Sequence, residues 1–212
     1  MMKYDLHMHT HYSKCSNLKP DTILKLAKKK KLDGIAITDH HEIKGALEVK
    51  KLNKNKNFEV IVGEEISTDK GDVLLYYLEK KVYETEFYKV VEEAKKQNAL
   101  IVIPHPFRRT MLHDHKFQMP LEKIKNIADA VECFNARMLF PYDNKKADLE
   151  ASRLGMAKTG GSDAHFSFEI GTGCTVFDGN LRNAIKNKKT KPCGRIKFGA
   201  FGGILSYLRK IY

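Results

Sequence analysis

Histidines and carboxylates recur in short clusters along this chain, each directly after a run of mainly apolar residues. The clusters read Asp5-Leu6-His7-Met8-His9, Thr38-Asp39-His40, Glu64-Glu65, Pro104-His105-Pro106 and Gly161-Ser162-Asp163-Ala164-His165. Imidazole nitrogens mixed with carboxylate oxygens, without a thiolate, suit Zn, Mn or Fe. Because these candidates outnumber the three or four ligands that one ion needs, we expect two to three divalent metal ions.

The strongest single cluster is the pair His7 and His9. Side chains alternate across a strand, so these two imidazoles project to the same side, about 6–7 Å apart along the backbone. An isolated histidine such as His40 is more often a hydrogen-bonded structural residue than a ligand. The whole set carries more weight, because five of the nine histidines fall where a predicted strand ends.

Apolar, β-branched runs alternate with lysine-rich segments of helical periodicity, a pattern typical of parallel strands joined by crossover helices. The predicted strands are Tyr4–His7, Gly34–Thr38, Phe58–Gly63, Val73–Leu78, Ala99–Ile103, Ala130–Phe134 and Met156–Thr159. The main predicted helices are Asp21–Lys31, Ile43–Lys51, Glu84–Gln97, Asn144–Leu154 and, in the tail, Ile204–Ile211. Seven such units predict an α/β fold with a closed or nearly closed TIM-like barrel, an open doubly wound sheet being the alternative.

In barrels of this kind the active site lies at the carboxyl ends of the strands, so the residues of these clusters can act together in one site. Glu65 stands among several imidazoles and is the natural bridge between two ions about 3.5–4 Å apart. A cluster of this kind polarises a phosphoryl oxygen and lowers the pKa of a bridging water. The residues therefore predict phosphoester hydrolysis by a metal-activated hydroxide.

Length and composition limit the remaining possibilities. The 212 residues suit one domain, and no apolar run is long enough for a membrane span. We expect a cytoplasmic protein without a signal peptide and without membrane contact. The four scattered cysteines predict reduced, structural thiols, and the net charge of +12 favours phosphorylated small molecules, nucleotides or nucleic acid as partners.

Six ordered segments together resemble the polymerase and histidinol phosphatase (PHP) domain. They read DLHMHTHYS, GIAITDHHE, VGEEIS, IPHPF, VECFNAR and GSDAH. The resemblance implies one domain over residues 1–212, a distorted (β/α)7 TIM-like barrel, with residues 166–212 as a PHP-associated segment packed on it. It also implies a trinuclear site with a first metal on His7, His9, Glu65 and Asp163, a second on Glu65 and His105, and a third on His40 and His165. Glu65, Asp163 and His40 are the residues we expect to be catalytic.

Two positions depart from the family pattern. The motif usually continues as HxHxxxSD, but here Ser13 is followed by Lys14, so the carboxylate expected for the third metal is missing. Lys14 could supply a positive charge there instead. Many relatives have a further histidine ligand after the third strand, where this chain offers Asp72.

Candidate residues for substrate binding are basic. They are Lys14, Arg108 and Arg109 after the His105 turn, and Arg137 after the sixth predicted strand. A guanidinium can hold phosphate oxygens bidentately, although solvated loop residues are an equal alternative for the arginines. Glu132 is expected to orient a ligand histidine or to pair with a lysine. His113 and His115 are expected to lie in a solvated loop, and His11 and His41 to point away from the ligands.

Three hypotheses remain. The first is a phosphoesterase that acts on a phosphomonoester or phosphodiester of a nucleotide, a nucleic-acid end or a small phosphorylated metabolite. The second is a non-catalytic RNA-binding barrel of the ribonuclease P subunit type, which would explain the charge but not the ligand set. The third is a C–N hydrolase on a similar barrel, which would need a bridging carboxylated lysine that no strand end clearly offers. Oligomeric state is open.

Overall fold

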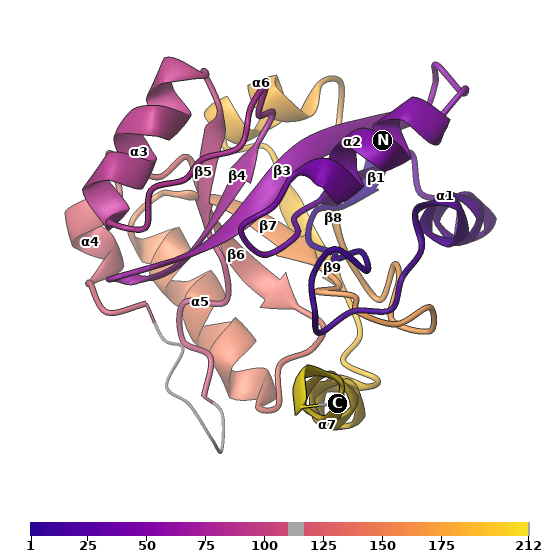
Figure 1. Ribbon diagram of the computed structural model, residues 1–212. Coiled ribbons are helices and arrows are strands. Elements are labelled where there is room, and N and C mark those ends of the chain that lie inside the picture. The colour runs from indigo at the N-terminus through magenta and orange to yellow at the C-terminus, as the bar shows by residue number, and fades with distance from the viewer. Residues whose placement is uncertain (110–116, 212) are drawn as a thin grey trace.

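The computed structural model describes residues 1–109 and 117–211, and a single curved sheet forms its centre (Figure 1). The strands are β1 (Met2–Asp5), β2 (Gly34–Ile37), β3 (Glu59–Thr68), β4 (Gly71–Tyr76), β5 (Leu100–Ile103), β6 (Ala130–Asn135), β7 (Ala157–Gly161), β8 (Gly173–Phe177) and β9 (Lys191–Gly194). The helices are α1 (Pro20–Lys29), α2 (Lys44–Leu52), α3 (Phe87–Lys96), α4 (Leu121–Ile124), α5 (Pro141–Arg153), α6 (Leu181–Lys186) and α7 (Gly199–Ile211). Each of the seven predicted strands is present.

The sheet has the order β7-β6-β5-β4-β3-β2-β1-β8-β9 and bends until its first and last parts meet. The meeting point lies just beyond β1 and β7, where Met8 bridges Ala164 in parallel. There the His9 amide donates to the Ala164 carbonyl at 2.9 Å, and the Asp163 amide donates to the His7 carbonyl at 2.8 Å. The predicted distorted TIM-like barrel is confirmed, and its closure brings His7, His9 and Asp163 together.

The expectation of parallel strands throughout is wrong at β4. This strand pairs antiparallel with both β3 and β5. Only Asp69 and Lys70 separate β3 from β4, which is too short for a crossover helix and makes a hairpin. The antiparallel strands β8 and β9 extend the sheet beyond β1 and were not predicted.

Helices α1, α2, α3 and α5 pack on the outer side of the sheet through apolar residues. In α1, Ile23, Leu24 and Ala27 are buried, and Pro20 occupies the first turn, where its missing N–H is not needed. The first helix of the C-terminal segment, α6, is capped by Asn180, whose side chain accepts the Asn183 amide at 3.2 Å. None of the helices in the described ranges is long and apolar enough to cross a membrane.

Two apolar clusters fill the fold. The larger one lies between the sheet and the helices outside it, and the smaller one includes inward positions of the strands such as Leu6, Ala36, Ile61 and Leu74. Leu181 of α6 belongs to the smaller cluster together with residues near the beginnings of β5, β6 and β7. That end of the barrel is therefore packed with apolar side chains, and the polar residues concentrate at the opposite end.

Candidate metal centre

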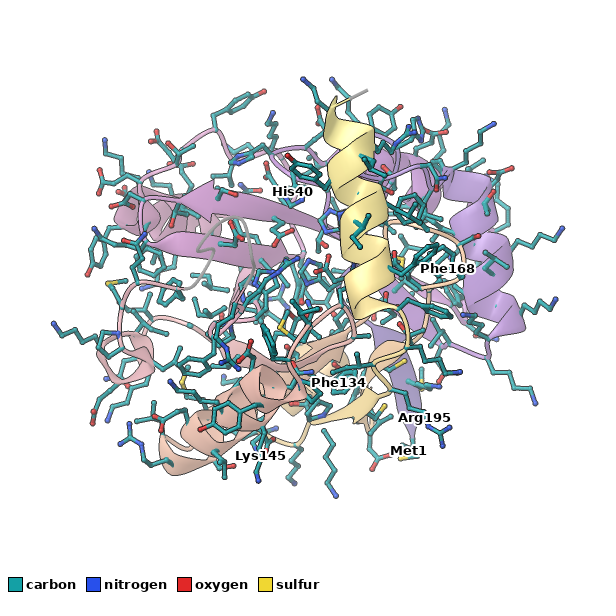
Figure 2. All side chains as sticks on the ribbon, turned by 90° about the horizontal axis from the view of Figure 1, so that it is seen from below. Met1, His40, Phe134, Lys145, Phe168 and Arg195 are labelled. Atoms are coloured by element: carbon teal, nitrogen blue, oxygen red, sulfur yellow. The ribbon has the colours of Figure 1, made fainter. Side chains whose placement is uncertain are left out.

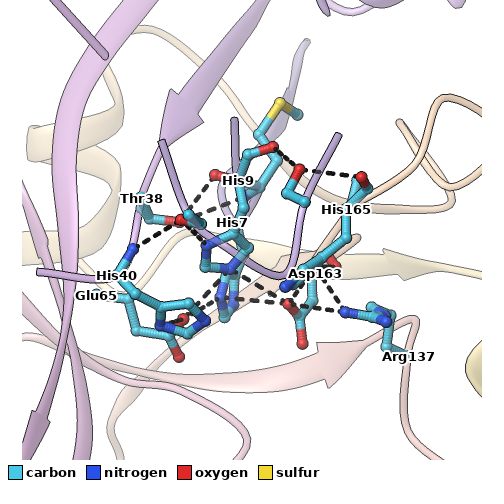
Figure 3. A network of polar contacts seen from close by, with 12 residues as sticks. His7, His9, Thr38, His40, Glu65, Arg137, Asp163 and His165 are labelled. Atoms are coloured by element: carbon cyan, nitrogen blue, oxygen red, sulfur yellow. Dashed lines mark hydrogen bonds and ion pairs between the residues drawn. The ribbon is translucent and has the colours of Figure 1, made fainter. Parts of the chain in front are cut away.

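The predicted ligands gather at the end of the barrel where the parallel strands finish (Figure 3). His7 and His9 follow β1, His40 follows β2, Glu65 lies within β3, His105 follows β5, and Asp163 and His165 follow β7. Four groups have ligand atoms within 4.8 Å of one another, namely His7-His9-Glu65, His7-His105-Asp163, His9-His40-His165 and Glu65-Asp72-His105. The site predicted from strand ends is thus one continuous cluster.

Glu65 lies at its centre. Its Oε2 atom is 3.3 Å from His7 Nε2, 3.3 Å from His9 Nε2 and 3.2 Å from His40 Nδ1. Its Oε1 atom is 3.3 Å from His105 Nε2. One buried carboxylate therefore faces four imidazoles with both oxygens, the arrangement expected of a ligand that bridges ions.

Asp163 provides the second carboxylate of the cluster. Its Oδ1 atom lies 3.4 Å from His9 Nε2 and 3.7 Å from His7 Nε2. Asp163 and His105 both have positive φ angles, 54° and 30°, which non-glycine residues adopt at a cost in free energy. The chain keeps this strained backbone at two residues of the cluster, as functional sites often do.

Charges within the cluster compensate one another. Burial raises the pKa of Glu65, but His7, His40 and His105 lower it by more. The pKa of Glu65 therefore lies well below its usual range. Burial lowers the pKa of His7, but Glu132, Asp163 and Glu65 raise it well above its usual value. Two ionised carboxylates in this buried position need cationic partners, either protons on imidazoles or divalent ions.

Glu132 orients two ligands from behind. The His7 Nδ1–H group donates to Glu132 Oε1 at 3.0 Å, a tautomer inferred from this bond, which leaves Nε2 facing Glu65. Glu132 Oε2 accepts the His105 backbone amide at 3.0 Å and the Asn135 side-chain amide at 3.0 Å. Of the two expectations for Glu132, the structure shows contact with a predicted ligand histidine rather than a pairing with a lysine.

Asp39 is a supporting residue that the sequence did not single out. Its carboxylate accepts the backbone amide of Thr10 at 2.6 Å, and the hydroxyls of Thr10 at 2.6 Å and Ser13 at 2.7 Å. Ser13 Oγ in turn accepts the His40 amide at 3.0 Å. This network holds the turn after His9 against His40, and its only signal in the sequence is the position of Asp39 beside a ligand.

Asp72 reaches the cluster because β4 is antiparallel. A residue near the start of β4 lies beside the end of β3, where Ser67 is its partner in register. Its carboxylate falls in one group with Glu65 and His105. The excluded His41 does point elsewhere, since its Nε2 atom accepts the Ser67 amide at 3.3 Å.

The predicted substrate-binding residues have different surroundings. Arg108 lies beside the cluster, with Nη1 3.5 Å from Asp163 Oδ2 and a quarter of its side chain exposed. The Arg109 guanidinium instead binds Asp143 at 2.8 Å and stacks over the Phe140 ring. Arg137 is buried and bonded to other protein groups, and Lys14 is exposed beside Ser13. His113 and His115 lie outside the described residues.

Comparison with known sequences places this cluster in a family. The family model described as PHP domain matches residues 5–140, and one described as PHP-associated matches residues 141–190. The chain belongs to the PHP domain family. Its ligand cluster, from His7 to His105, falls largely within the PHP domain match, and Asp163 and His165 fall in the PHP-associated match.

Two similar proteins come from Methanocaldococcus jannaschii. Uncharacterized protein MJ1587 is 38% identical over 148 residues, which are 64% of this chain and 82% of that protein. Uncharacterized protein MJ0417 is 36% identical over 180 residues, which are 83% of this chain and 70% of that protein.

Solved structures share the fold at low identity. A two-domain protein from Bacteroides vulgatus, described as containing a predicted PHP-like metal-dependent phosphoesterase, has a TM-score of 0.76 and 19% identity. The similarity covers 92% of this PHP chain and 65% of the longer protein. PsfC from Pseudomonas syringae has a TM-score of 0.69 and 18% identity, covering 100% of this chain and 97% of that one.

The residues present fit divalent ions. His9 Nε2 is buried without a hydrogen-bond partner although it faces two carboxylates, as a nitrogen reserved for a metal would. Among the described residues, nitrogen and carboxylate donors converge from six strands or their ends, without thiolates. Imidazole and carboxylate sets of this kind hold Zn, Mn or Fe, and the four overlapping groups leave room for more than one ion.

Proposed function

We propose that this PHP protein is a metal-dependent phosphoesterase that hydrolyses a phosphomonoester or phosphodiester of a nucleotide, a nucleic-acid end or a small phosphorylated metabolite. The observation that carries the proposal is the position of Glu65, whose two oxygens face His7, His9, His40 and His105. The cluster lies at the end of the barrel where such folds carry their active sites.

His7, His9, Glu65 and Asp163 would hold one ion, Glu65 and His105 with Asp72 a second, and His40 and His165 a third. Bound divalent ions would supply Lewis-acid polarisation of the phosphoryl group and would acidify a water molecule. Glu132 keeps the Nε2 atom of His7 directed at the cluster, and Asp39 fixes the turn beside His40. The protein groups thus pre-orient the ligands before any substrate arrives.

Arg108 is the best placed of the predicted residues for a phosphate. Its guanidinium already lies near an anionic oxygen of Asp163, and its partial exposure leaves donors accessible. Lys14 would add a second, more mobile positive charge beside Ser13, at the place where the family motif has a carboxylate. The net charge of +12 favours nucleotidic substrates over neutral ones, because it attracts polyanions over long distances.

The test is a metal count and a hydrolysis assay on the purified chain. The protein is stripped with a chelator, reloaded with Mn²⁺ or Zn²⁺, and assayed with an aryl phosphate beside a His7→Ala variant. We expect two to three ions per chain and hydrolysis that depends on both metal and His7. Fewer than one ion per chain, together with RNA affinity that falls steeply with salt, would instead favour the RNA-binding barrel.

A further inference from the structure

Helix α7 lies at the end of the barrel that carries the metal centre (Figure 2). The two family matches end at residue 190, so this helix, which begins at Gly199, lies beyond the part of the chain that they describe. In the view from below it runs in front of the barrel beside His40.

The face of α7 that packs on the barrel is built from small residues. Gly199, Gly202 and Ser206 follow helical spacing along one side. A Cβ atom at Gly202 would lie only 2.0 Å from Glu169 Oε1, whereas one at Gly203 would meet nothing within 4 Å. Glycine at position 202 thus permits an approach that alanine would prevent.

Beneath this face, Arg137 connects α7 to a predicted metal ligand. Its Nη2 atom donates to Ser206 Oγ at 2.8 Å, and its Nη1 atom lies 2.6 Å from His165 Nδ1. Its Nε atom lies 3.0 Å from Glu169 Oε1. Arg137 and Glu169 are both almost fully buried, so their charges depend on each other and on the helix that covers them.

Glu169 completes the connection from the backbone side. Its Oε2 atom accepts the amide of His165 at 2.8 Å and that of Phe166 at 3.0 Å. His165 is therefore held at its ring Nδ1 atom between Arg137 and the Asp163 carbonyl, which is 2.8 Å away, and by its main chain through Glu169. Arg137 and Glu169 both lie directly under α7.

A second contact fastens the other end of the helix. Arg209 Nε donates to the Ser16 carbonyl at 2.9 Å. Ser16 Oγ lies 2.9 Å from the carbonyl of His9 and 2.9 Å from that of His165, so this residue joins the two ligand-bearing turns. The two contacts of α7, from Ser206 to Arg137 and from Arg209 to Ser16, therefore both involve residues that hold His165.

We propose that α7 is a positioning element of the metal centre, which seats Gly202 and Ser206 on Glu169 and Arg137 and so fixes the imidazole of His165 toward His9 and His40. The purpose of this arrangement rests on the proposed metal-dependent function. The arrangement itself is a property of the protein without metal and can be measured there. Arg137 acts in it through His165, as a positioning residue.

The experiment compares Gly202→Ala with Gly203→Ala in the full chain. Both substitutions exchange the same residues in the same helix and gain similar helix propensity, but only the first places a methyl group against Glu169. Imidazole ¹⁵N spectra of the metal-free proteins should show a shifted His165 signal in Gly202→Ala alone. Circular dichroism checks that both variants fold.

Metal titration against a chelating dye gives the second readout. In Gly202→Ala the affinity of the ion that His40 and His165 would hold should fall about 10–100-fold, as it does when an outer partner of a ligand is lost. The other ions should bind as in the wild type, and Gly203→Ala should match the wild type throughout. If Gly202→Ala fails to fold, Ser206→Ala, with Ser206→Thr to restore the hydroxyl, is measured in the same way.

The outcomes separate the two proposals. Identical His165 signals in both glycine variants would overturn the role of α7, whatever the wild type does with metal. A shifted signal in Gly202→Ala together with no metal binding by the wild type would support the coupling and contradict the phosphoesterase proposal. Unequal signals but equal metal affinities would also overturn the positioning role, since His165 would then move without consequence.

Discussion

The candidate metal centre has two halves that are supported differently. We call His7, Glu65 and His105 the Glu65 half, and His9, His40 and His165 the His165 half. Glu65 is itself part of strand β3, and the outer partner of the Glu65 half, Glu132, belongs to strand β6. The outer partners of the His165 half lie mainly outside the strands, in the turns that contain Arg137 and Glu169 and in helix α7.

The two halves also differ in charge and in exposure to solvent. The Glu65 half contains a buried carboxylate, whereas the His165 half consists of three imidazoles beside the buried Arg137. His40 is 32% exposed, in contrast to the fully buried His7. Burial and the nearby Arg137 also hold the pKa of His165 well below its usual value. We expect the Glu65 half to bind metal more tightly, because it offers a negative ligand and a more rigid support.

The largest effect is expected when the bridge is removed. Glu65→Gln keeps the shape of the side chain but removes the charge that faces four imidazoles. Metal affinity should fall by more than the roughly 10–100-fold loss expected for an outer partner, and hydrolysis should fall to the level of the stripped protein. Metal counting and the aryl phosphate assay measure both losses.

Glu64→Gln is the matched control for that variant. Glu64 is the preceding residue on β3, but its carboxylate accepts the Val82 amide at 3.0 Å and takes no part in the ligand groups. Its substitution should leave the metal count and the activity unchanged. Equal losses in the two variants would mean that β3 as a whole, rather than the bridging carboxylate, determines the result.

The next effect tests whether the two halves can be weakened separately. Glu132→Gln should reduce metal affinity at the Glu65 half about 10–100-fold, because the His7 Nδ1–H group would lose its anionic partner. Glu169→Gln should act on the His165 half instead, through the amide of His165 and through Arg137. Titration of each variant with Mn²⁺ would reveal which ion is lost first. Loss of the same ion in both would show that the halves are one cooperative unit.

The contrast also explains what the sequence could predict. The predicted ligands of the Glu65 half, and His9 as well, follow or lie in apolar strand runs, and alternation along a strand is readable without a structure, so His7, His9, Glu65 and His105 were found. Asp72 was found through the family pattern, although its route into the site depends on the unexpected hairpin of β3 and β4. The barrel itself was predictable from the seven runs.

The supports of the His165 half were harder to predict. Glu169, Ser16 and Ser206 are scattered over the chain and have no periodicity that links them to a ligand. Arg137 was expected to bind substrate, since nothing in the sequence shows that α7 buries its guanidinium against Glu169 and Ser206. Contacts between distant segments become visible only when the tertiary packing is known.

A smaller effect is expected at the arginines beyond His105. Arg108→Ala should raise KM for the aryl phosphate about tenfold, the loss of roughly one charge-assisted hydrogen bond, with less effect on kcat. Arg109→Ala, its neighbour, should affect the attachment to Asp143 near the start of α5 and leave KM nearly unchanged. The reverse pattern in steady-state kinetics would move the phosphate contact from Arg108 to Arg109. Lys14→Ala, measured alongside, should raise KM less, because an exposed lysine is well screened.

The last comparison concerns stability rather than activity and again sets Glu64 against Glu65. Burial raises the pKa of Glu64 to about 7, whereas the imidazoles lower that of Glu65. A carboxyl group whose pKa is higher in the folded state stabilises the protein only while it is protonated. Its contribution is therefore complete below its ordinary pKa of 4.5 and is lost as the pH rises through about 7.

Glu64→Gln removes this titration, because glutamine stays neutral at every pH. In urea unfolding of the metal-free proteins, the variant should match the wild type near pH 4 and exceed its free energy of unfolding by about 2 kcal/mol near pH 8. Parallel pH profiles would show that Glu64 titrates normally. A difference confined to high pH would confirm that the pKa of Glu64 is raised although its neighbour on β3, Glu65, stays ionised. The surroundings of the two carboxyl groups, rather than their position in the sequence, would then explain why only Glu65 belongs to the proposed metal centre.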